Sequence, residues 1–172
     1  MMWWPKPTGI IARATSIEPK RLMLWTAPNH TRVLLISTDE HNDDDNPQYF
    51  NLFVSSEERL SGLIYKSAFT EWVWDISELA QVEPDLDNWT MTDAPCPQGT
   101  LACDGNGEHF IAYSSQHHLP RRAWLSLKTF KRGSPSHAAV LFPKWRVVTR
   151  RPDAQTLFQW PTDLNDNESG GE

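Results

Sequence analysis

Cysteine is scarce in this chain, since only Cys96 and Cys103 occur among its 172 residues. Small secreted folds with little core are held together by several disulfides, so two cysteines exclude that class. Long apolar runs are also missing: no stretch approaches the roughly 18 apolar residues that a membrane-spanning helix needs, and the opening MMWWPKPTGIIARA contains no apolar run of signal-peptide length. We therefore expect a soluble, cytoplasmic protein that does not bind membranes.

The signatures of common catalytic and metal sites are absent as well. The chain has no Walker-type Gly-Lys-Ser/Thr and no G-x-S-x-G elbow. Cys96, Cys103, His109, His117 and His118 lie close together in the sequence, but without the C-x-x-C or H-x-x-x-H spacing of zinc sites. We predict a non-catalytic protein without metal or cofactor, while an enzyme whose site leaves no mark in one sequence is the alternative. Whether Cys96 and Cys103 pair stays open.

Tryptophan, by contrast, is abundant, with nine residues in a chain that is 39% apolar. A chain of this length favours one domain that buries about two thirds of the surface of its unfolded form. Each Trp brings a large area to bury and one N–H that needs a partner. We expect most of the tryptophans in the core, and the alternative is a set of aromatic binding surfaces.

Apolar alternation predicts strands in the first half of the chain. Residues 32–38, RVLLIST, are too short for an ordinary helix, and residues 48–54, QYFNLFV, can pair with them. Between them, residues 39–47 hold five carboxylates and read as a solvated loop. Cap-type Ser and Glu residues followed by Leu60, Leu63 and Ile64 predict a helix from about 56 to 66, whereas residues 67–81 fit a helix or a strand equally well.

The second half of the chain is β-like. Asp104-Gly105-Asn106-Gly107 supplies the residues that a tight hairpin turn needs. Residues 122–132 and 138–151 read as two more strands joined by residues 133–136, with Pro143 at an edge or a bulge. The fold class that follows is α+β: one domain over residues 1–162, mainly an antiparallel sheet, with one or two helices from residues 55–82 packed on one face. Residues 163–172 read as a disordered acidic tail.

One stretch suggests a function. Residues 121–151 contain no Asp or Glu and hold nine of the sixteen basic residues of a chain whose net charge is -6. If residues 122–132 form one strand, alternation places Arg122, Trp124, Lys128, Phe130 and Arg132 on one face. Cations neutralise phosphates, and aromatic rings stack on unpaired bases. Such residues also occur on edge strands that resist aggregation, and the acidic loop and tail can neutralise them within the molecule.

The favoured hypothesis is a binding protein for nucleic acid or a nucleoprotein complex, with DNA and RNA not distinguished. Its predicted contacts are Arg121, Arg122, Trp124, Lys128, Phe130, Lys131, Arg132, Trp145, Arg146, Arg150 and Arg151. The alternative is a small acidic interaction or inhibitor protein. Its acidic segments would steer association, and Trp or Tyr anchors would bind a protein partner.

Overall fold

The fold is built from antiparallel β-strands. The computed structural model describes residues 10–42, 45–57, 60–91, 97–114, 122–136 and 139–161. In these parts of the chain the strands form sheets of six, five and three strands, and the helical segments are the short 3-10 turns η1 (Ala14–Ser16) and η3 (Lys66–Ala68). The predicted α+β class is therefore wrong, because no helix packs on a sheet in the described residues.

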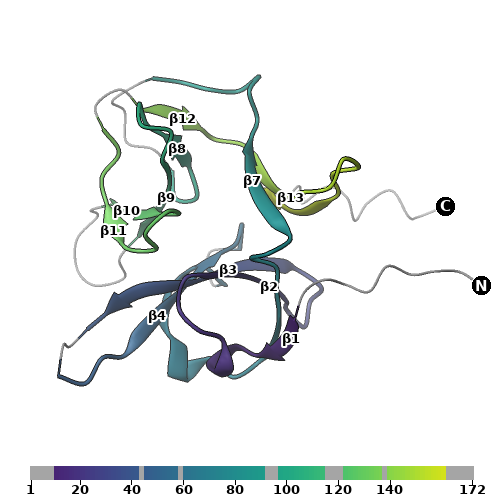
Figure 1. The fold of residues 1–172 in the computed structure, drawn as a ribbon, viewed down its shortest axis with the longest axis vertical. Helices are drawn as coiled ribbons and strands as arrows, with labels where there is room; N and C mark the ends of the chain where they lie inside the picture. The colour runs from purple at the N-terminus through teal and green to yellow at the C-terminus, as the bar shows by residue number, and fades with distance from the viewer. Residues whose placement is uncertain are drawn as a thin grey trace, which may run out of the picture.

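The six-stranded sheet spans the lower half of the view in Figure 1. Its strands, in spatial order, are β1 (Ile10–Arg13), β6 (Trp72–Asp75), β2 (Arg21–Thr26), β3 (Arg32–His41), β4 (Tyr49–Val54) and β5 (Gly62–Tyr65). The central strand β3 is buried on both faces, which explains its uninterrupted apolar run. Leu34 and Ile36 face one core, and Val33 and Leu35 face another. The predicted strands at 32–38 and 48–54 are confirmed.

The two smaller sheets lie above the six-stranded sheet (Figure 1). One consists of β11 (Arg132–Gly133), β10 (Arg122–Ser126), β9 (His109–Ser114), β8 (Leu101–Cys103) and β12 (Val140–Phe142), and the other of β14 (Thr156–Trp160), β13 (Trp145–Thr149) and β7 (Ala80–Pro84). Leu34 of the first sheet, Ile111 of the second and Trp145 of the third belong to one cluster, which we call the main core. All three sheets therefore share a single apolar interior.

The predicted hairpin at residues 104–107 is confirmed, because β8 pairs antiparallel with β9 on either side of it. One carboxylate oxygen of Asp104 accepts hydrogen bonds from the backbone N–H of Asn106 at 2.9 Å and of Glu108 at 3.1 Å. Gly107 has φ +75°, a conformation that favours glycine. The turn is therefore fixed by its own side chain and backbone.

The predicted helix at 56–66 is wrong. The end of this segment is strand β5, which pairs with β4 so that Leu63 lies opposite Leu52 and Ile64 opposite Asn51. Alternation sends Leu63 to the main core and Ile64 to the cluster on the other face of the six-stranded sheet. Pairing with the preceding strand, β4, outweighs the local helix signal. The ambiguous residues 67–81 also contain a strand, β6, and lead into β7.

The two strands predicted at residues 122–132 and 138–151 are each divided into two shorter strands. Strand β10 ends at Ser126, a turn follows in which Phe130 has φ 58°, and β11 folds back so that Arg132 pairs with Leu125. The second strand breaks at Pro143, which has no N–H to donate, and β12 and β13 belong to different sheets. The predicted tail at 163–172 lies outside the described residues, so the domain boundary at residue 162 stays a prediction.

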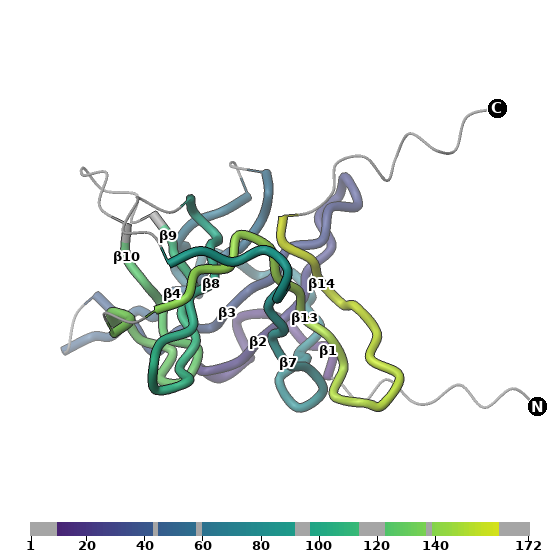
Figure 2. Tube along the Cα trace, turned by 90° about the horizontal axis from the view of Figure 1, so that it is seen from above, coloured from purple at the N-terminus to yellow at the C-terminus, as the bar shows by residue number. Residues whose placement is uncertain are grey.

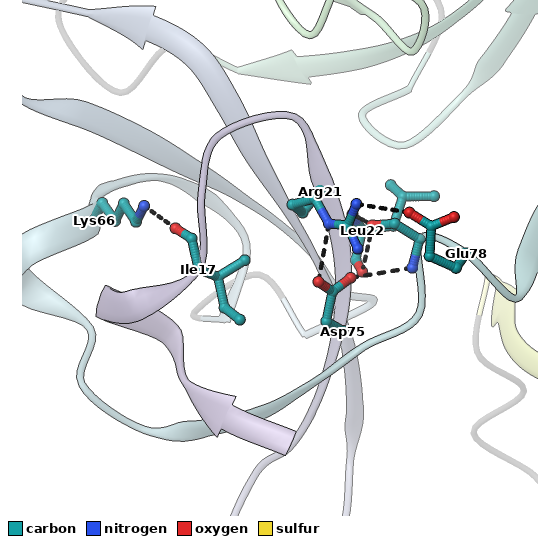
Figure 3. Close-up of polar contacts among 7 residues, drawn as sticks. Ile17, Arg21, Leu22, Lys66, Asp75 and Glu78 are labelled. Atoms are coloured by element: carbon teal, nitrogen blue, oxygen red, sulfur yellow. Dashed lines mark hydrogen bonds and ion pairs between the residues drawn. The ribbon is translucent and has the colours of Figure 1, made fainter. Parts of the chain in front are cut away.

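Polar contacts tie the corner where β2 meets β6. Asp75 is 7% exposed and accepts a hydrogen bond from Arg21 Nε at 2.9 Å, while Glu78 contacts the same guanidinium at 3.0 Å (Figure 3). In the same view Lys66 Nζ donates to the carbonyl of Ile17. Burial lowers the pKa of Lys66 against the opposing effect of Glu18. These contacts hold the segment between η1 and β2 onto the sheet.

Candidate interaction surfaces

The predicted basic surface is divided between two sheets. Trp124 and the segment from Lys128 to Arg132 belong to β10, β11 and the turn between them, whereas Arg146 lies on β13 and Arg150 and Arg151 follow that strand. Figures 1 and 2 both place β10 well away from β13. Arg121 and the side chain of Arg122 lie outside the described parts of the chain. The one continuous face that alternation predicted is therefore not formed, because residues 122–132 fold back on themselves.

The segment from Phe130 to Arg132 contacts two acidic residues of the same chain. Lys131 Nζ lies 3.4 Å from a carboxylate oxygen of Asp39, and the backbone N–H of Arg132 donates to the Glu40 carboxylate. The backbone N–H of Asp39 also donates to the carbonyl of Phe130 at 2.8 Å. Asp39 and Glu40 belong to β3 and not to the solvated loop that the sequence suggested. The turn after β10 is thus docked onto the end of β3.

Other cations of the predicted surface have structural contacts too. Arg146 pairs with Glu83 at 2.9 Å, and Arg132 Nε donates to the Tyr113 hydroxyl at 3.2 Å. Arg150 Nε donates to the backbone carbonyl of residue 80 at 3.0 Å. Within the described residues Lys128 and Arg151 are exposed and have no recorded side-chain partner. Among the cations of the predicted set whose side chains the structure describes, only these two are free to meet a ligand without first releasing a contact.

The predicted stacking residues are more buried than the hypothesis requires. Trp145 is 2% exposed, and its indole N–H donates to the carbonyl of Gly99 at 2.7 Å. Phe130 is half-buried and packs against the main core, and Trp124 is half-buried as well. Trp145 is therefore a core residue and not a platform on which a base can stack.

A different surface exposes large apolar side chains. Leu86, Trp89 and Met91 are 71%, 58% and 60% exposed, and we call them the apolar anchors. They lie in residues 85–91, the anchor segment, which leaves β7 and passes beside β12 at the top of Figure 1. In the sequence, Pro84 and the acidic residues around this stretch are typical of a long connection. The available signal was three large apolar residues in six positions of an otherwise acidic run.

Backbone hydrogen bonds hold the anchor segment at both ends. The N–H of Asp85 donates to the carbonyl of Lys144 at 3.1 Å. Thr90 and Leu141 exchange two hydrogen bonds, at 2.9 and 2.8 Å. Between these points the N–H of Asn88 donates to the carbonyl of Asp85 at 3.3 Å, closing a turn. The apolar anchors are therefore presented by an ordered segment.

A groove of about 550 Å³ lies beside the anchor segment, and we call it the Trp160 groove. Trp160 lines it and stacks on Trp145, with ring centroids 6.5 Å apart. The Trp160 ring also lies against Gly99, where an added Cβ would be 2.1 Å from the ring. Its other lining residues include Leu86 and five ionisable groups, Glu83, Asp85, Asp87, Lys144 and Arg146. The groove thus joins one fixed aromatic ring to a charged rim.

The charges of the rim are partly compensated. Glu83 pairs with Arg146, as described above. Asp85 accepts hydrogen bonds from Asn88 Nδ2 at 2.8 Å and from the backbone N–H of Asp87 at 3.0 Å, and these bonds, helped by Lys144 and Arg146, lower the pKa of Asp85. The Asp87 carboxylate has no ion-pair partner among the described residues. It is therefore the uncompensated charge of the groove.

The described residues contain no group of three or more His, Cys, Asp or Glu side chains that could hold a metal ion. Cys103 forms no disulfide with another described residue, and Cys96, His117 and His118 lie outside the described residues, so the question of a Cys96–Cys103 bond stays open. In the same parts of the chain no helix has the length and apolar character to cross a bilayer. Comparison with protein-family models, curated proteins and solved structures found no match to this chain.

Proposed function

We propose that the protein is a non-catalytic binding protein whose anchor segment docks into another protein. One observation carries the proposal: three large apolar side chains lie more than half exposed on six consecutive residues that are hydrogen-bonded in place. Large apolar side chains that are exposed close together in the chain are candidates for an interaction site, since contiguous apolar patches are uncommon on monomeric proteins. Trp is the residue type that most often dominates the energy of such interfaces.

The anchor segment is already ordered, which lowers the free-energy cost of binding a partner. An interface made by a flexible loop loses affinity to the ordering of its side chains and backbone, at about 0.5–1.5 kcal/mol for each immobilised long side chain. Here the backbone is already held by its bonds to Leu141 and Lys144. Asp85 and Asp87 alternate with the apolar residues, so the fitting partner is a protein with an apolar cleft flanked by Lys or Arg.

Nucleic-acid binding by residues 121–151 stays a prediction of the sequence. The geometry supports it less well, since its cations belong to two separate sheets and two of them, Lys131 and Arg146, are paired with Asp39 and Glu83. Lys128 and Arg151 give it a specific test, because reversing their charge removes free cations without breaking a described contact. A cytoplasmic location belongs to the same proposal; it rests on the low cysteine content and is checked by cell fractionation.

The experiment is a capture from extract of the source cells, run with and without nuclease treatment, with the immobilised protein as bait. Three baits are compared: wild type, the Leu86→Ser/Trp89→Ser/Met91→Ser variant, and an Ile10→Ser/Ile11→Ser control, since both isoleucines are 65% exposed on β1. We expect a polypeptide that wild type and control retain and the anchor variant loses. Retention by the anchor variant, or loss of capture only after nuclease treatment, would contradict the proposal and favour the basic surface.

A further inference from the structure

The Trp160 groove has the dimensions of a ligand site. Its volume of about 550 Å³ lies within the range of small-molecule and side-chain pockets, roughly 300–1,000 Å³. The Trp160 ring lies so close to Gly99 that a methyl group there would overlap it, and it stacks on Trp145. A ring held in this way offers one fixed aromatic surface to whatever enters.

The charges that line the groove select the ligand. Lys144 and Arg146 contribute two positive charges, and Glu83, Asp85 and Asp87 contribute three negative ones, which leaves one net negative charge. Glu83 is occupied by Arg146, and Lys144 acts on Asp85, so the surplus belongs to Asp87. The negative charge of Asp87 would repel a phosphate or carboxylate ligand. A wholly apolar ligand would remove water from five charged groups without replacing their interactions.

We infer that the groove receives one arginine side chain of the protein partner, whose guanidinium stacks on Trp160 and pairs with Asp87. A cation is attracted by the face of an indole ring, and the guanidinium group is the cation that also stacks flat. The same group donates two parallel hydrogen bonds to one carboxylate, which a lysine ammonium cannot do. One arginine side chain can therefore contact both the fixed ring of Trp160 and the unpaired carboxylate of Asp87.

This inference rests on the proposed function, because it names the chemistry that the partner brings beside the apolar anchors. Leu86 belongs both to the anchors and to the groove lining, so a partner seated on the anchors has the groove directly at its edge. The Asp87 carboxylate then accepts one of the basic side chains that we expect beside the apolar cleft of the partner. An arginine next to an apolar cleft is the expected recognition feature of the partner.

The test uses the full chain and a small probe, N-acetyl-arginine methylamide, in place of the unidentified partner. Binding is followed by the indole N–H resonance of Trp160 in ¹⁵N-labelled protein. The comparison probe is the citrulline analogue, which has nearly the same shape without the charge. We expect saturable shifts with a dissociation constant on the order of 1 mM for the arginine probe, and binding at least about 5-fold weaker for the citrulline probe.

Two substitutions with the same charge change make the test specific. Asp87→Asn should weaken arginine binding at least about 5-fold. Asp153→Asn is the matched control, because Asp153 is exposed in the connection at the opposite end of β13 from Trp145, and it should leave binding within about 2-fold. Equal binding of both probes, no response of Trp160, or equal effects of the two substitutions would overturn the inference.

The Trp89→Ser variant separates this inference from the proposed function. Trp89 does not line the groove, so this variant should bind the arginine probe as wild type does while losing capture of the partner. Normal capture without probe binding would refute only the groove assignment. Probe binding without anchor-dependent capture would refute only the proposed function.

Discussion

Removal of the Trp145 side chain should unfold the protein far more readily than removal of an exposed tryptophan. Trp145 lies in the main core at 2% exposure, between Phe158 and Trp160. Replacing a buried Trp by Ala costs about 3–5 kcal/mol. The free energy of unfolding of a domain this size is about 5–15 kcal/mol, so Trp145→Ala should lose a large fraction of it. At about 2–4 °C per kcal/mol, the expected fall in Tm is roughly 6–20 °C.

The hydrogen bond of Trp145 can be separated from its packing. Trp145→Phe keeps most of the ring volume but leaves the Gly99 carbonyl without the donor that now lies 2.7 Å away. Leaving a buried acceptor unpaired costs about 1–3 kcal/mol. We therefore expect Trp145→Phe to be less destabilising than Trp145→Ala by at least about 1 kcal/mol.

The assay is urea unfolding followed by far-UV circular dichroism, because tryptophan fluorescence itself changes in these variants. Trp89→Ala is the matched control: Trp89 is 58% exposed, and its removal should change the free energy of unfolding by less than about 0.5 kcal/mol. A Trp145→Ala variant as stable as wild type, with lost oligonucleotide binding, would refute the placement of Trp145 in the core and restore it as a stacking residue.

Three further substitutions test the packing and the electrostatics. Asp75→Asn removes the buried charge that pairs with Arg21 and should cost about 1–3 kcal/mol in urea unfolding, less than for a fully buried pair because Arg21 is partly exposed; an unchanged midpoint would contradict this. Gly99→Ala should be destabilising by thermal unfolding, because its Cβ would overlap the Trp160 ring and its φ is +83°, and wild-type Tm would rule out that contact. Burial opposes ionisation of Asp104, but backbone hydrogen bonds from Glu108, Asn106 and Ser136 outweigh it and lower the pKa of Asp104. The ionised Asp104 therefore contributes to the free energy of unfolding above its unfolded-state pKa, about 3.9, and this contribution is lost as the pH falls through the lower folded-state pKa. Asp104→Asn should flatten the decline in stability below about pH 4. An equally steep decline in the variant would refute the assignment.

Strands could be predicted where one face or both faces of the chain are apolar. The run at 32–38 is buried on both sides, and the turn chemistry of residues 104–107 specifies its hairpin locally. The helix predicted at 56–66 was wrong because its pattern of apolar residues does not specify one structure locally. Its Leu63 and Ile64 fit a helical face in isolation, and the pairing with β4, which lies outside the segment itself, sends them to different cores.

The site could be predicted less well than the fold, because clustering in the sequence is not clustering in space. Residues 121–151 hold most of the basic charge, but the break at Pro143 sends their two halves to different sheets. No local pattern shows that Lys131 meets Asp39. Nor does it distinguish Trp145 from Trp89, since burial of Trp145 depends on contacts with Gly99 and Trp160 that only the folded chain brings together.

The most direct measurement is the dissociation constant of the captured polypeptide, determined by isothermal titration calorimetry for wild type, Trp89→Ala and Lys128→Glu/Arg151→Glu. Binding through the apolar anchors predicts that Trp89→Ala weakens the affinity at least about 30-fold, the effect of a residue worth about 2 kcal/mol, while the charge-reversal variant stays within about 3-fold of wild type. Wild-type affinity of Trp89→Ala, together with strong loss in Lys128→Glu/Arg151→Glu, would contradict the claim that the anchor segment is the binding surface.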